Sequence, residues 1–151
     1  MKISCFQPMN RGIPIFFNID VSVGKNGNNG NSDDVLLVQF LLKKNGELVP
    51  GDTPEGAQAN EVMKKVPLTG QIDQATIDGI TAFQAARRRE YPGTIVDGRV
   101  SPATHYRYGG HFFTIAAMNG YIRKFAPQVW PRLHDFSDCP ATLKVKIPQI
   151  L

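Results

Sequence analysis

The chain has 151 residues, of which 42% are apolar and 20% are charged, and its formal net charge is +4. This length is enough to bury the core of one domain, and the composition is ordinary for a globular protein. Since no apolar run approaches the roughly 20 residues that cross a bilayer, we expect no membrane span. The first residues lack a sustained apolar stretch and a cleavage site, so we also expect no signal peptide.

The charge is unevenly distributed along the chain. Residues 1–86 hold 7 Lys and Arg against 9 Asp and Glu, whereas residues 87–151 hold 10 against 4. A basic half suits a polyanion such as teichoic acid, nucleic acid or anionic lipid, but it is more commonly a solvated surface. No recognition-helix, sheet-aromatic or zinc motif accompanies the basic residues, so we expect no nucleic-acid partner.

Residues 1–32 indicate an N-terminal strand followed by a loop. Apolar residues alternate from Phe17 to Val23, which predicts one face of a strand. Residues 24–32 are rich in Gly and Asn and therefore predict a loop. Because they lack the Gly-Lys-Ser/Thr ending that leads into a helix, we expect no phosphate site there.

Residues 33–108 predict a helical core that begins with a central helix. Asp33 and Asp34 cap a helix that runs to Lys44, and its apolar residues cover most of the circumference. Gln39 is the lone polar residue among them, and we expect its amide to bond to the backbone of nearby turns. Residues 47–67 hold several Pro and Gly residues and predict an inserted loop with one helical turn.

Two segments 28 positions apart repeat one pattern. They read Thr-Gly-Gln-Ile-Asp-Gln-Ala-Thr at residues 69–76 and Asp-Gly-Arg-Val-Ser-Pro-Ala-Thr at residues 97–104. Each predicts a tight turn at Gly, one buried apolar residue and a helix N-cap. We therefore expect a second helix from Asp73 to about Glu90, with three arginines in its last turn. A third helix is expected from Ser101.

Residues 109–151 predict an extension that packs on this core. Apolar residues recur at helical spacing from Phe112 to Phe125, which predicts a further helix. Residues 142–147 alternate and predict a strand that pairs with the N-terminal strand. The predicted fold class is therefore mainly α, with a three-helix core, an extra C-terminal helix and a small two-stranded β closure made by the N- and C-terminal segments.

The spaced motifs of residues 33–104 resemble those of the peptidoglycan-binding domain family, a small three-helix module of many bacterial cell-wall hydrolases and phage lysins. The matching residues, which span about half of the chain, are Asp34, Val35, Val38, Gln39, Leu42 and Gly46, then 70–76, Ile80, Phe83 and Gln84, then 96–104. The chain departs from the family pattern at Thr69, where Asp is usual, and at Asp73 and Ser101, where Gly is usual. The resemblance implies the three-helix core and binding to the cell wall.

No catalytic or metal-binding pattern is present in the sequence. His105 and His111 are six positions apart, so they do not share a helix face as metal ligands would, and His134 adds no known spacing. The histidine and serine motifs of hydrolases are missing. Cys5 and Cys139 are the only cysteines; we expect reduced thiols, or one bridge if the protein is exported. We therefore predict a non-catalytic protein with no cofactor and no metal.

A ligand site is predicted beside the second repeated turn. Glycan and stem-peptide sites combine an aromatic platform with a few polar groups. His105, Tyr106 and Tyr108 follow this turn, and Arg99 within it carries a planar fork that suits a peptide carboxylate. The alternative interpretation is that the tyrosine rings are half-buried core residues and that Arg99 is solvated.

The predicted function is non-catalytic binding of bacterial cell-wall peptidoglycan, or a fragment of it, in a shallow groove. This function requires delivery to the periplasm or cell wall by a non-classical route. The alternative is a cytosolic, secretion-system or phage-associated adaptor that reuses the fold with a protein partner and no glycan ligand.

Overall fold

The computed structural model describes residues 1–4, 16–105, 107–108 and 111–151. In chain order its elements are β1 (Lys2–Ser4), β2 (Phe16–Asn18), β3 (Val23–Gly24), α1 (Ser32–Leu48), α2 (Pro54–Lys64), α3 (Gln74–Glu90), β4 (Arg99–Val100), β5 (Arg107–Tyr108), β6 (His111–Phe112), α4 (Thr114–Phe125), a 3₁₀ turn η1 (Leu133–Asp135) and α5 (Ala141–Ile150). The strands form three antiparallel pairs, β1 with β2, β3 with β4 and β5 with β6. The predicted class, mainly α with a small β component, is confirmed.

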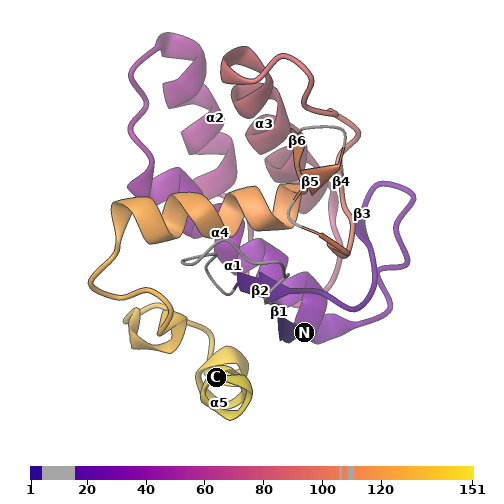
Figure 1. Ribbon diagram of the computed structural model, residues 1–151, viewed down its shortest axis with the longest axis vertical. Coiled ribbons are helices and arrows are strands. Elements are labelled where there is room, and N and C mark those ends of the chain that lie inside the picture. Colours follow the sequence, from indigo (N-terminus) through magenta and orange to yellow (C-terminus); the bar gives the residue numbers. More distant parts are fainter. Residues whose placement is uncertain (5–15, 106, 109–110) are drawn as a thin grey trace.

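Helix α1 is the centre of the fold, as its apolar circumference predicts. Its apolar side chains from Val35 to Leu42 are all buried. The helix begins one turn earlier than expected because the Asn31 side chain, rather than an aspartate, caps it by accepting the backbone N–H of Asp33 and Asp34. In Figure 1, α4 crosses α1, α2 and α3 stand side by side, and α5 lies at the opposite end.

Gln39 holds the first repeated turn, as predicted. Its Oε1 accepts the backbone N–H groups of Thr69 and Gly70 at 3.0 and 2.8 Å. Its Nε2 donates to the carbonyl of Gln71 at 2.9 Å and to the hydroxyl of Thr76 at 3.0 Å. One buried amide therefore satisfies both backbone donors and one backbone acceptor of the turn that leads into α3.

Gln84 holds the second repeated turn in the same way. Its Oε1 accepts the backbone N–H groups of Asp97 and Gly98 at 3.1 and 2.9 Å. Its Nε2 donates to the carbonyl of Arg99 at 3.0 Å and to the hydroxyl of Thr114 at 3.2 Å. Thr114 is the first residue of α4. Each glutamine therefore also bonds to a threonine in the first turn of a helix, Thr76 in α3 and Thr114 in α4.

The helix predicted to start at Ser101 is wrong, because α4 begins only at Thr114. The reason lies in a buried side chain from the N-terminal region. Asn18 Oδ1 accepts the backbone N–H of Ala103 at 3.0 Å, and Asn18 Nδ2 donates to the Ala103 carbonyl at 2.8 Å. A helix capped at Ser101 would need the Ala103 carbonyl to accept the backbone N–H four residues further on. The hairpin β5–β6 follows before the chain turns into α4.

The prediction of a loop at residues 47–67 is also wrong, because α2 occupies most of it. Thr53 caps this helix by accepting the backbone N–H of Gly56 at 3.0 Å, and Pro54 fills its first position. Helix α2 packs closely on α1, since a Cβ at Gly46 would lie 2.8 Å from the carbonyl oxygen of Asn60. The helix of the inserted segment is therefore packed against α1.

The C-terminal tail forms helix α5 rather than the predicted strand. Leu143 and Ile147, four positions apart, are fully buried, whereas Val145 between them is 62% exposed. The alternation of these three residues fits a strand, but the spacing of the two buried ones is that of one helix face. The tail forms a helix because this conformation buries both Leu143 and Ile147 in the core. The expected pairing of the tail with the N-terminal strand does not occur.

The N-terminal strand is shorter than predicted and has another partner. Strand β2 ends at Asn18 and pairs with β1. The carboxylate of Asp34 accepts the backbone N–H groups of Asp20 and Val21 at 2.8 and 3.0 Å, which bends the chain away from the strand direction. Val23 resumes in β3, which pairs with β4 of the second repeated turn.

Cys139 is a free, buried thiol, and burial raises its pKa to about 11. Only the thiolate reacts with an alkylating reagent, so at pH 8 about 0.1% of this thiol is reactive, against about 10% for one with a pKa of 9. In a Cys5→Ser variant we expect alkylation by iodoacetamide to be at least about 100-fold slower in the native than in the urea-unfolded protein.

The rate at which iodoacetamide alkylates Cys139 in the native protein should also rise about tenfold for each pH unit between 8 and 10. The unfolded sample at each pH is the matched control. Equal rates for the folded and unfolded protein would show that the thiol is open to solvent.

Candidate functional site

Two of the four residues predicted as a ligand site, Arg99 and Tyr108, lie in different sheets. Arg99 lies in β4, and its side-chain Nε is buried with no hydrogen-bond partner among the described residues. His105 is exposed, and its Nδ1 lies 3.2 Å from the hydroxyl of Thr104. Tyr108 lies in β5, and Tyr106 falls outside the described residues. Neither Arg99 nor His105 lines the cavity described next.

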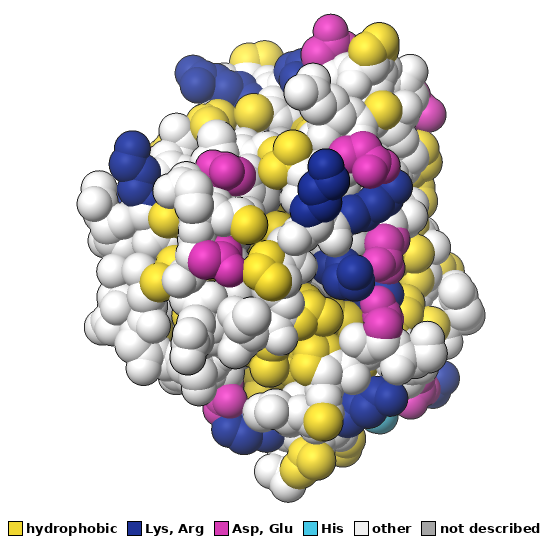
Figure 2. Space-filling view, turned by 180° about the vertical axis from the view of Figure 1, so that it is seen from behind, with side chains coloured by type: hydrophobic (Ala, Val, Ile, Leu, Met, Phe, Trp, Pro, Cys, Tyr) yellow, Lys and Arg dark blue, Asp and Glu magenta, His cyan; other side chains and the backbone are white. Residues whose placement is uncertain are grey.

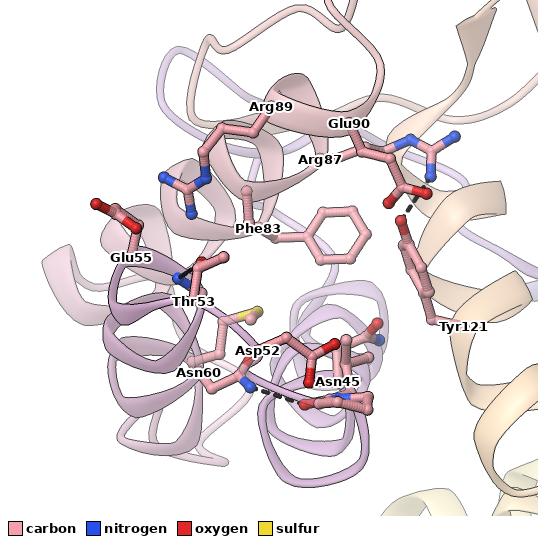
Figure 3. Close-up of a pocket in the computed structure, with 15 residues that line it drawn as sticks. Asn45, Asp52, Thr53, Glu55, Asn60, Phe83, Arg87, Arg89, Glu90 and Tyr121 are labelled. Atoms are coloured by element: carbon pink, nitrogen blue, oxygen red, sulfur yellow. Dashed lines mark hydrogen bonds between the residues drawn. The ribbon is translucent and has the colours of Figure 1, made fainter.

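A cavity of about 390 Å³ opens where α2 and the end of α3 meet α1 and α4 (Figure 3). Its apolar surface comes from Val49, Pro50, Met63, Phe83 and Ala86, and its polar surface comes from Asn45, Asp52, Thr53, Glu55, Asn60, Arg87, Arg89, Glu90 and Tyr121. Pockets of this size, with an apolar wall and a few polar groups, are typical of small-ligand sites.

Arg87 and Tyr121 form a fixed wall of this cavity. The Arg87 guanidinium donates to the Tyr121 hydroxyl at 3.1 Å and lies 4.4 Å from the centre of the Tyr91 ring. The Tyr121 ring meets Phe83 edge-on, with 5.9 Å between ring centres. Burial raises the pKa of Tyr121, and the nearby Arg87 lowers it by less. The phenol therefore stays neutral.

Four charged residues at the cavity have no ion partner within the part of the chain that the structure describes. They are Asp52, Glu55, Arg89 and Glu90. In Figure 3, Arg89 and Glu55 lie on one side of Phe83, and Glu90 lies near Tyr121. Both signs of charge are thus available to a ligand.

Asn45 adds a buried acceptor to the cavity. Its side chain is fully buried, and its Nδ2 donates to the backbone carbonyls of Leu41 and Met118 at 2.8 and 3.2 Å. Its Oδ1 has no hydrogen-bond partner among the described residues. An unpaired buried acceptor costs about 1–3 kcal/mol.

Sequence reasoning missed this cavity because it treated the 47–67 segment as a loop. Thr53, Pro54 and Glu55 read as an N-cap, a first-turn proline and a first-turn acid, which is the ordinary signature of a helix start. That signal could have revealed α2. The meeting of its N-terminal end with Arg87 and Arg89 could not be read from the sequence, because it depends on how α2 and α3 pack.

The described residues contain no group of three His, Cys, Asp or Glu residues placed to hold a metal ion, and none of their helices has the length and apolar character of a membrane crossing. On the face seen in Figure 2, Lys and Arg side chains stand beside Asp and Glu side chains. This face therefore carries both charges rather than a basic surface for a polyanion.

Comparisons of the chain with models of known protein families, with curated proteins and with solved structures find no match.

Proposed function

We propose that the chain binds bacterial cell-wall peptidoglycan, or a fragment of it, without altering it chemically. The observation that carries this proposal is the pair of buried glutamines, Gln39 and Gln84, each bonded to one repeated Gly turn. Both belong to the motifs that resemble the peptidoglycan-binding domain family. Helices α1 and α3, which carry these two glutamines, are two of the three helices that the resemblance implies.

The chemistry of the cavity also supports this proposal. A scaffold can carry unrelated functions, so a binding function also needs a site with suitable chemistry. Peptidoglycan offers sugars and short stem peptides with free charges, and the cavity combines the aromatic side chains of Phe83 and Tyr121 with unpaired charges of both signs. We place the ligand there rather than beside Arg99. Peptidoglycan lies outside the cytoplasm, so the proposal includes delivery to the periplasm or wall.

A pull-down on purified sacculi tests the function. Sacculi stripped of anionic polymers should retain the native protein at physiological salt, and should retain much less of a heat-unfolded sample or of an unrelated folded protein of net charge +4. The paired substitutions Arg99→Ala and Tyr106→Ala should leave retention unchanged if the cavity is the site. Retention no higher than in the two controls would reject the function and favour the adaptor alternative.

A further inference from the structure

We infer that the cavity between α1, α2, α3 and α4 recognises a short peptide by its free amino group and a carboxylate, and not a sugar. The inference rests on the proposed function only for the source of that peptide, which would be a peptidoglycan stem peptide. The charges that line the cavity define the chemistry of this ligand.

The amino group is the first determinant. Three carboxylates line the cavity, those of Asp52, Glu55 and Glu90, against the two guanidinium groups of Arg87 and Arg89. The cavity is therefore locally acidic in a chain whose net charge is +4. None of the three carboxylates has a cation partner among the described residues. An ammonium group beside Asp52 or Glu90 gains charge-assisted hydrogen bonds that a neutral sugar cannot offer.

The carboxylate is the second determinant, and Arg89 is its partner. Arg87 is already held by Tyr121 and by the Tyr91 ring, so it shapes the wall. Arg89 is exposed and has no such partner among the described residues. Its planar fork matches a carboxylate with two parallel bonds. In Figure 3, Arg89 and Asp52 lie on different sides of the cavity, so a ligand with opposite charges at its two ends can reach both.

Apolar surface for the peptide comes from Phe83 and Met63. Asp52 and Glu55 belong to the inserted segment. The close packing of α2 on Gly46 of α1 fixes the backbone of this segment before the ligand arrives.

Titration with synthetic stem-type tetrapeptides, followed by amide NMR and calorimetry, tests the inference. The peptide with a free amino group and a free carboxylate should bind with a Kd of about 0.1–1 mM, since few contacts offset the cost of ordering the ligand. Acetylation of its amino groups should weaken binding at least about fivefold, and so should Asp52→Asn combined with Glu90→Gln. Asp78→Asn, an exposed acid of α3 outside the cavity, is the matched control and should change the Kd less than twofold.

A second pair of variants tests the other end of the ligand. Arg89→Ala should weaken binding of the free-carboxylate peptide about fivefold and leave its amidated form unaffected, whereas Arg88→Ala, the exposed neighbour that does not line the cavity, should change neither. Ala86→Phe, which fills the cavity without changing charge, should abolish binding, and circular dichroism will show whether that variant is folded.

The outcomes separate the inference from the proposed function. Peptide binding that is unaffected by acetylation and by all cavity variants overturns the inference, even if sacculi retain the protein. Peptide binding lost with the cavity variants, together with no retention on sacculi, supports the inference and rejects peptidoglycan as the source. Binding of a muropeptide sugar alone, with no response to the tetrapeptide, overturns the inference directly.

Discussion

Replacing Gln39 with leucine is expected to lower the free energy of unfolding by about 3–5 kcal/mol. Leucine fills much of the same space but provides no hydrogen bond, so the backbone N–H groups of Thr69 and Gly70 lose their acceptor. The Gln71 carbonyl loses its donor at the same time. Each orphaned buried group costs about 1–3 kcal/mol, and water reaches this site poorly because Gln39 is fully buried.

Urea denaturation followed by far-UV circular dichroism measures this loss. Gln74→Leu is the matched control, because the Gln74 amide is exposed and donates only to Asp78; we expect its effect to stay within about 0.5 kcal/mol. Gln84→Leu should lower stability as much as Gln39→Leu. A loss below about 1 kcal/mol for both buried glutamines would show that the repeated turns hold without them.

Gly24→Ala is expected to destabilise the protein by about 3 kcal/mol or more. Gly24 has a φ of +114°, where a side chain is strained, and an added Cβ would lie 2.3 Å from the carbonyl oxygen of Gly98. That carbonyl belongs to the second repeated turn, and the backbone N–H of Lys25 donates to it at 2.9 Å. Neither the backbone at Gly24 nor the backbone at Gly98 can move away from the added Cβ without breaking the β3–β4 pair.

Gly120→Ala is the matched control and should act in the opposite direction. Gly120 lies inside α4, and no atom comes within 4 Å of an added Cβ. Alanine in a helix interior is favoured over glycine by up to about 1 kcal/mol, so this variant should be more stable than the parent chain. Thermal and urea unfolding of the two variants give the comparison, and a Gly24→Ala variant as stable as the parent would contradict the close approach of the two turns.

The candidate site could be predicted from the sequence only in part. The resemblance to a binding family and the three arginines at the end of α3 are visible in the sequence, and the aromatic residues that follow Arg99 predict a site there. The cavity combines residues as far apart as Asn45 and Tyr121. Such a combination depends on the packing of four helices, for which a single sequence has no signal.

The amino-acid sequence alone determined the elements that depend on interactions between residues close together in the chain. Asp73 caps α3 by accepting the backbone N–H of Thr76 at 2.7 Å, and the apolar circumference of α1 placed it at the centre. The partner of Gln39 was also predictable, because a buried amide must find donors and acceptors and the first repeated turn offered both.

Only the tertiary structure decided the elements for which two local conformations compete. Residues 101–104 carry the same helix-start signals as the first repeat, yet Asn18, 85 positions away from Ala103, bonds to the Ala103 carbonyl that the helix would need. The tail fits both a strand and a helix, and burial of Leu143 and Ile147 chose the helix. In both places a contact between distant parts of the chain outweighs a local preference of about 1 kcal/mol or less.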